Sequence, residues 1–126
     1  MCYFVIYIIM YIIIFRYAMI IIGGVLTFIF QSSSVFTSTL TRLVGSGFLS
    51  LDQAYPLTLG SNIGTTTTGI LAALTADPNR LSQTIQLALC HLYFNIFGIL
   101  IFYPIPWMRW PLPMAQMFAH KVAKHR

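Results

Sequence analysis

Residues 17–51 read YAMIIIGGVLTFIFQSSSVFTSTLTRLVGSGFLSL, two apolar runs with a short polar segment between them. The first apolar run stops abruptly at Gln31 and three serines, and a second, moderately apolar run follows. At about 1.5 Å per residue the first arm covers only about two-thirds of a hydrocarbon core roughly 30 Å thick, so it does not cross alone. Two short arms joined by a polar tip indicate a re-entrant helical hairpin over residues 17–51. The alternative is one kinked, continuous span from residue 17 to residue 36.

The composition of the chain indicates a membrane protein. Of its 126 residues, 58% are apolar and only 7% are charged, whereas soluble domains carry roughly one-quarter charged residues. The net charge of +5 does not require nucleic acid, because four of the seven basic residues lie from Arg109 onward, beyond the last apolar run. That clustering predicts a basic cytoplasmic tail over residues 107–126. A lipid-headgroup or regulatory site in the tail is the alternative.

Three further segments complete the predicted all-α membrane fold. Residues 53–76 are interrupted by Gly60-Ser-Asn-Ile-Gly followed by four threonines, a pattern typical of a discontinuous transmembrane helix that exposes its backbone to a cavity. Residues 84–104 predict an unbroken transmembrane helix, with Trp107 and Trp110 at the membrane interface. Residues 1–16 are apolar but lack the basic start and small-residue cleavage site of a signal peptide, which favours a truncated membrane segment or the edge of a gene model.

The two polar interruptions carry hydroxyls and amides but no charge. Hydroxyl groups donate to anion oxygens and accept from hard cations, so one cluster can hold a cation and an anion together. Helix N-termini add positive ends for the anion, and freed carbonyls serve the cation. Without a fixed lysine or arginine, a co-bound cation must supply the compensating charge, which couples the two occupancies. The alternative is that these hydroxyls only satisfy their own backbone or join helices.

Other residue patterns argue against enzymes and metal sites. Cys2 and Cys90 are far apart and predict buried structural thiols rather than a metal site or a disulfide. His91 and Asn95, one turn apart, predict an interhelical hydrogen-bonding pair, with a place on the substrate path as the alternative. The glycine-rich segment lacks the Gly-Lys-Ser/Thr ending of a P-loop. No acid–base pair lies in the apolar region, so an enzyme is not expected.

Several motifs in order resemble one family. They are QSSSVFTS from Gln31, AYPLTLGSNIGTTTT from Ala54, IQLALCH from Ile85 and YPIP from Tyr103. From about Tyr17 to the C-terminus the chain resembles the second repeat of the type II sodium-dependent phosphate cotransporters. The resemblance implies one half of an inverted-repeat transporter, with residues 17–106 as the repeat and its partner QSSS repeat missing.

The resemblance also implies site residues. Phosphate would contact Ser32, Ser33 and Ser34, with Thr66 as a weaker candidate. No cofactor is expected, and sodium, as the co-transported ion, would be coordinated by Gln31, Ser32, Thr65 and Thr68. The setting would be the lipid bilayer of the plasma membrane, including its apical face, in a multi-pass protein. One departure is Arg42, which stands where the family usually has proline.

Two functions compete on this sequence. The first is sodium-coupled symport of inorganic phosphate, with this chain as a partial form that carries half of the site. The second is a non-transporting partner subunit, or truncated isoform, that associates with a full-length transporter. The substrate rests on the resemblance alone, because hydroxyl chemistry would also suit sulfate or a carboxylate.

Overall fold

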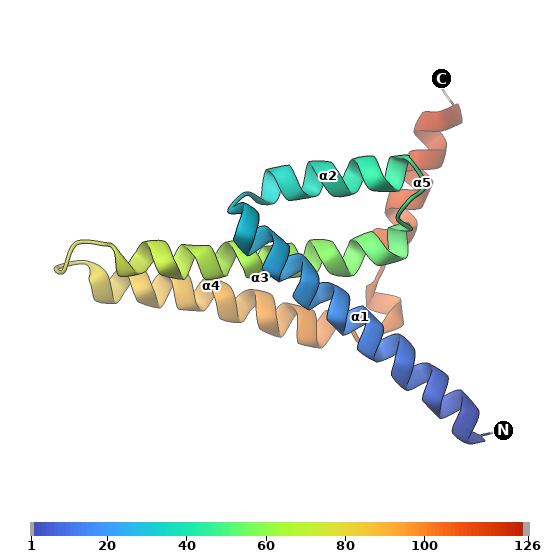
Figure 1. The fold of residues 1–126 in the computed structure, drawn as a ribbon, viewed down its shortest axis with the longest axis horizontal. Helices are drawn as coiled ribbons and strands as arrows, with labels where there is room; N and C mark the ends of the chain where they lie inside the picture. Colours follow the sequence, from blue (N-terminus) through green and yellow to red (C-terminus); the bar gives the residue numbers. More distant parts are fainter. Residues whose placement is uncertain (1, 125–126) are drawn as a thin grey trace.

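A computed structural model describes residues 2–124, and every regular element in that range is a helix. The helices are α1 (Cys2–Phe30), α2 (Ser33–Gly45), α3 (Leu51–Leu74), α4 (Leu81–Phe102), the 3-10 helix η1 (Pro106–Met108) and α5 (Pro111–Lys124). In Figure 1, α3 and α4 run side by side in opposite directions, α1 crosses α3, α2 turns back from the end of α1, and α5 lies crosswise at one end. The predicted all-α class is confirmed over the described residues.

Helix α1 is longer than the sequence predicted. It runs without a break from Cys2 through a half-buried Arg16 to Phe30, so residues 2–16 and the expected short arm are one element. Its 29 residues span about 43 Å, which exceeds a hydrocarbon core of about 30 Å. The prediction of a short arm starting at residue 17 is therefore wrong, because arginine is a good helix former and one charge did not end the helix.

Within the part of the chain that the structure describes, two helices are long and apolar enough to cross a membrane, over Tyr3–Phe30 and Leu81–Phe102. Within both, most side chains are exposed, including bulky ones such as Ile21, Phe94 and Phe97. Large apolar side chains exposed along a helix of this length belong in lipid. Helix α4 lies within three residues of the helix predicted over residues 84–104; the helix is confirmed, and its crossing of a membrane stays a prediction.

The predicted break in residues 53–76 is wrong. Helix α3 is continuous from Leu51 to Leu74, and Pro56 lies inside it. The four threonines do not unwind the helix, because their hydroxyls donate to carbonyls three or four residues earlier in the same helix.

The glycines of α3 serve a close helix crossing. A Cβ atom on Gly60 would overlap the carbonyl group of Ile20, and one on Gly64 would lie 2.5 Å from the Gly24 oxygen and 2.9 Å from the Thr27 Cβ. Gly60 and Gly64 thus form a small-xxx-small contact that lets the α1 and α3 backbones touch.

The Gln-Ser-Ser-Ser segment does end a helix. Gln31 has φ 51°, in the left-handed region, and Ser32 is extended, after which α2 begins. Helix α2 then returns and packs Phe36 and Leu40 against Leu57 of α3. The chain reverses here (Figure 1), so the alternative of one kinked span over residues 17–36 is wrong.

The chain leaves α4 through an aromatic cluster. Tyr103 is buried, with the Tyr17 ring 5.7 Å and the Tyr55 ring 6.0 Å from its own. Arg109 lies 4.8 Å from the Tyr103 ring centroid and donates from Nε to the Tyr103 carbonyl at 2.9 Å. These contacts fix the start of the tail against α1, α3 and α4. The tail then forms helix α5 in residues for which the sequence predicted only a basic segment.

Candidate functional site

The three serines lie where the chain enters α2. Ser32 is the N-cap, and its Oγ accepts from the Val35 amide at 3.4 Å. Ser33 and Ser34 occupy the first turn, where backbone N–H groups have no partner inside the helix. Such a helix start offers amide donors, hydroxyl donors and a positive dipole end to an anion.

The first turn of α2 itself contains no charged side chain. The first turn of α2 contains no acidic residue, and Arg42, the basic residue of the helix, lies in its last turn. Arg42 is exposed about two turns from the serines. The groups that α2 itself offers to an anion near Ser32 are therefore neutral.

The hydroxyl groups of Thr65 and Thr68 in α3 have defined hydrogen-bond acceptors. Thr65 donates to the carbonyls of Ser61 and Asn62, and Thr68 donates to that of Thr65 at 2.7 Å. Each hydroxyl proton is thereby committed to the helix, while lone pairs on the oxygen stay free. These hydroxyls suit a cation better than an anion in this arrangement.

Thr66 is placed differently from the other predicted residues. It is 4% exposed, and its hydroxyl donates to the carbonyls of Asn62 and Ile63. A contact to phosphate would require that proton to leave both carbonyls. Thr66 therefore has the weakest geometry of the predicted phosphate ligands.

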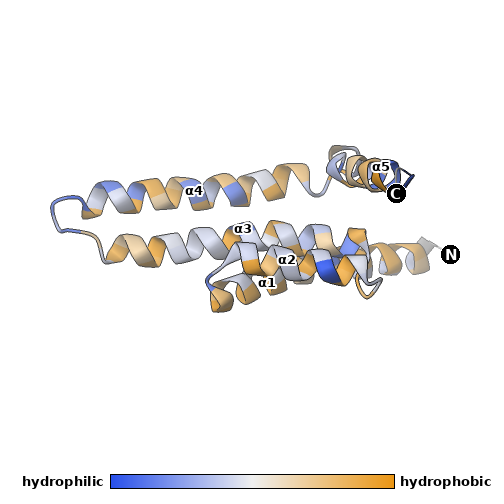
Figure 2. Cartoon of the chain, turned by 90° about the horizontal axis from the view of Figure 1, so that it is seen from above, coloured by the Kyte–Doolittle hydropathy of each residue, from blue (hydrophilic) through white to orange (hydrophobic). Residues whose placement is uncertain are grey.

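The fold brings the Gln-Ser-Ser-Ser segment and the threonine segment of α3 to the same level along α3. The last turn of α1 contacts α3 at Gly64, where the Phe28 amide nitrogen lies 3.2 Å from the position that a Gly64 Cβ would take. Gly64 directly precedes the threonines, and Gln31 follows Phe28 by three residues, or about 4.5 Å of helix. In Figures 1 and 2 the turn after α1 lies beside the middle of α3.

Thr27 is a residue that the sequence reasoning missed. It is fully buried beside Gly64, and its hydroxyl has no hydrogen-bond partner among residues 2–124. It lies one helical turn before Gln31, so it adds an unsatisfied oxygen at the level of the threonines. The available signal was a lone threonine in an otherwise apolar run, which the sequence analysis left unexplained.

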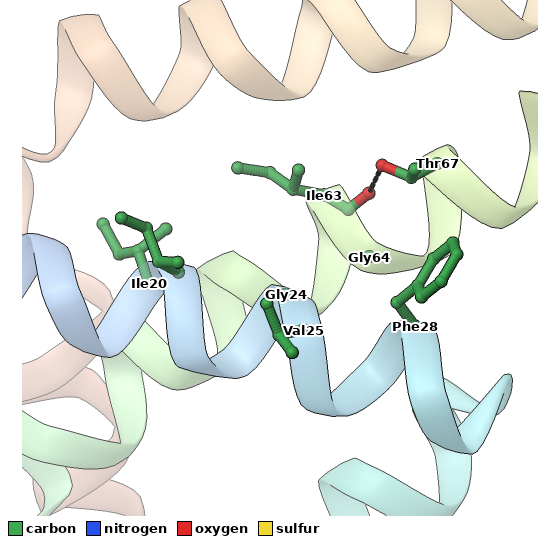
Figure 3. A pocket seen from close by; sticks show the side chains of 8 residues that line it. Ile20, Gly24, Val25, Phe28, Ile63, Gly64 and Thr67 are labelled. Atoms are coloured by element: carbon green, nitrogen blue, oxygen red, sulfur yellow. Dashed lines mark hydrogen bonds between the residues drawn. The ribbon is translucent and has the colours of Figure 1, made fainter.

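A groove of about 410 Å³ lies along the crossing of α1 and α3 (Figure 3). Its only hydroxyl is that of Thr67, which donates to the Ile63 carbonyl at 2.8 Å. The lining is otherwise apolar or glycine and consists of Ile20, Ile21, Gly24, Val25, Phe28, Ile63 and Gly64. This groove offers no charge or free donor to an anion, so it is not a phosphate site by its chemistry.

A smaller cavity of about 200 Å³ lies between α3 and α4. It brings Asn62, next to the threonine segment, to the same cavity as Asn95 and Tyr55. Asn95 lines this cavity and therefore faces α3. His91 is exposed and is not among the residues that line the cavity. Cys90 is a free, exposed thiol, which makes the prediction of burial wrong for that cysteine. The structure describes no side chain for Cys2.

Among residues 2–124, two candidate membrane spans and a lipid-facing apolar surface define the class as a helical membrane protein, with two neutral, hydroxyl-rich segments at one level. The chain belongs to the Na+/Pi-cotransporter family, whose family model matches residues 7–111. The match starts ahead of Tyr17, where the similarity was expected to begin, so part of residues 1–16 is family sequence as well as part of α1.

Individual relatives agree with that family. Over 110 residues the chain is 56% identical to sodium-dependent phosphate transport protein 2A of Oryctolagus cuniculus and 57% identical to sodium-dependent phosphate transport protein 2B of Homo sapiens. These alignments cover 87% of this chain but only 17% and 16% of the two relatives. The chain therefore spans about one-sixth of the length of these relatives. No solved structure matches it.

Proposed function

We propose that this chain serves sodium-coupled symport of inorganic phosphate across the plasma membrane, as a partial form that carries half of the substrate and sodium site. The observation that carries the proposal is a helix start with three serines, in a turn beside the middle of α3, where threonine oxygens keep free lone pairs. The names of the relatives, sodium-dependent phosphate transport proteins, supply the identity of the two ions.

The roles divide according to what each group can offer. Ser32, Ser33 and Ser34 bind phosphate through hydroxyls and the free amides of the first turn of α2. Gln31, Ser32, Thr65 and Thr68 bind sodium through side-chain oxygens, and Thr66 assists with phosphate only if its hydroxyl turns away from the helix. Ser32 belongs to both sets, which places the two ions next to each other.

Coupling follows from the neutral lining of the site. The first turn of α2 offers phosphate no lysine or arginine, so in this proposal its charge is compensated by sodium. When sodium leaves, the anion loses most of its electrostatic stabilisation, and the two affinities rise and fall together by the same factor.

The proposed setting extends beyond the described chain. We propose that residues 17–51 act as a re-entrant hairpin in one half of an inverted repeat, and that the missing first repeat supplies the rest of the site. The tail after Trp110 would then be cytoplasmic, because the basic residues of the second half cluster there.

The test is Thr65→Val in a full-length transporter of the family that carries residues 7–111 of this chain. Valine keeps the branched shape and deletes one oxygen. Losing one ligand to a charged partner costs about 1.5–3 kcal/mol, so apparent sodium affinity should fall roughly tenfold or more. Apparent phosphate affinity should fall too and recover partly at high sodium. Phosphate uptake against sodium concentration, at matched surface expression, measures both.

The matched control is Thr58→Val in the same helix. The Thr58 hydroxyl also donates to a carbonyl four residues earlier, at 2.9 Å, but lies outside the threonine segment. It should leave sodium activation unchanged. If Thr65→Val and Thr58→Val behave alike, Thr65 is not a sodium ligand.

A further inference from the structure

Helix α5 is set apart from the rest of the molecule by its direction and its exposure. In Figure 1 α5 runs crosswise to α3 and α4, and in Figure 2 it lies at the end of α4 from which the tail continues. None of its residues is buried, although half or more of them are apolar. If α4 spans the bilayer, a helix crosswise to it at its end lies along the membrane surface.

The two sides of α5 differ in chemistry. Met114, Phe118 and Val122 follow each other at four-residue spacing, so they share one face. They are 56%, 73% and 54% exposed. A polar row of Gln116, His120 and Lys124 has the same spacing but starts two residues later, which places it about 200° around the helix. The helix is therefore amphipathic, and its apolar row is uncovered in the described structure.

Charge and aromatic residues indicate what covers this row. No acidic residue follows Asp77 in the sequence, whereas Arg109, Lys121 and Lys124 are basic. Trp107 and Trp110, just before α5, are 89% and 61% exposed. Exposed tryptophans at the end of a span are typical of the interfacial layer of a bilayer, and lysines beside an apolar row are typical of helices on anionic lipid.

We infer that α5 binds the surface of an anionic lipid leaflet, with Met114, Phe118 and Val122 inserted at the boundary of headgroups and acyl chains. Lys121 and Lys124 contact the lipid phosphates and carboxylates. The family match ends at residue 111, so this role concerns a segment outside the part shared with the family model. It does not depend on transport.

The test uses the full chain in lipid nanodiscs, which leave both membrane faces open. Single cysteines are introduced as Phe118→Cys or Gln116→Cys in a Cys2→Ala/Cys90→Ala background. Their rates of reaction with a bulky, uncharged polyethylene-glycol maleimide are then compared. In discs that contain phosphatidylserine, the Phe118→Cys variant should react much more slowly than the Gln116→Cys variant. In phosphatidylcholine discs the difference should shrink.

Charge variants then test the lipid contact. Each lysine near an anionic surface changes the docking equilibrium about fivefold, so Lys121→Gln/Lys124→Gln should speed the Phe118→Cys reaction about 25-fold in the anionic discs. Arg80→Gln, which removes one positive charge in the exposed turn between α3 and α4, should leave it unchanged. Two results would overturn the inference. One is equal reaction rates at the two positions, and the other is a Phe118→Cys reaction that is just as slow in discs of pure phosphatidylcholine as in the anionic discs.

Discussion

The Gln-Ser-Ser-Ser turn and the threonine segment of α3 are both polar, yet only the first ends a helix. At the turn, the Ser32 side chain accepts from the Val35 amide, which lies ahead of it in the chain. In α3, Thr65 and Thr68 donate to carbonyls behind them. A forward bond satisfies an amide at a helix start, while a backward bond requires a helix already in place. The direction of the side-chain bond, rather than polarity, separates the two segments.

Glycine adds to the same contrast. Gly60 and Gly64 look like helix breakers in sequence, but each lies where the backbone of α1 leaves no room for a Cβ atom. Gly69, further along α3, has open space around it. A glycine of α3 can thus be required for packing or be merely tolerated, depending on whether α1 lies against it.

The largest expected effect breaks the α1–α3 crossing. Gly60→Ala places a methyl group against the Ile20 carbonyl, so the helices must separate, and we expect a loss of about 2–3 kcal/mol in the free energy of unfolding. Gly69→Ala, in the same helix, should instead stabilise by about 0.5–1 kcal/mol, because alanine is the better helix former. Denaturant titration in micelles, followed by the helical circular dichroism signal, measures both.

Opposite signs at Gly60 and Gly69 are the discriminating result. If both alanines stabilise, α1 and α3 do not touch at Gly60, and the glycines would again be read as points of flexibility in α3.

The sequence predicted the helical membrane class, α4 and the end of a helix at Gln31, because these depend on long apolar runs and on local turn chemistry. It failed on α3, where the same glycine and threonine residues fit both an unwound helix and a closely packed one. The contact with α1 distinguishes the two cases. Helix α1 is distant from α3 in the sequence, and its predicted length was too short because Arg16 was taken as a boundary. The predicted site residues stay predictions, although the fold brings their two segments to one level.

The next effect concerns the forward bond. Ser32→Ala removes the N-cap of α2, and we expect that helix to lose about 1 kcal/mol. Ser38→Ala in the same helix removes a backward bond to the Ser34 carbonyl, and should change stability by less than about 0.5 kcal/mol. Amide hydrogen exchange over the first turn of α2 reports the difference. Equal losses for the two serines would mean that bond direction does not matter here.

The smallest expected effect separates stability from function at Gln31. Its φ of 51° costs a side-chain-bearing residue strain that glycine avoids, while glycine adds entropy to the unfolded chain. The net gain for Gln31→Gly should be about 0.5 kcal/mol in the same micelle titration.

If Gln31 is also a sodium ligand, the substitution in a full-length transporter should weaken sodium activation while the fold becomes slightly more stable. If Gln31 only shapes the turn, Gln31→Gly should leave phosphate uptake unchanged. Gly47→Ala provides the reverse control, since Gly47 has φ 79° in the turn before α3 and should lose stability when a Cβ atom is added. Sodium activation that survives Gln31→Gly would remove Gln31 from the proposed site and leave it a turn residue.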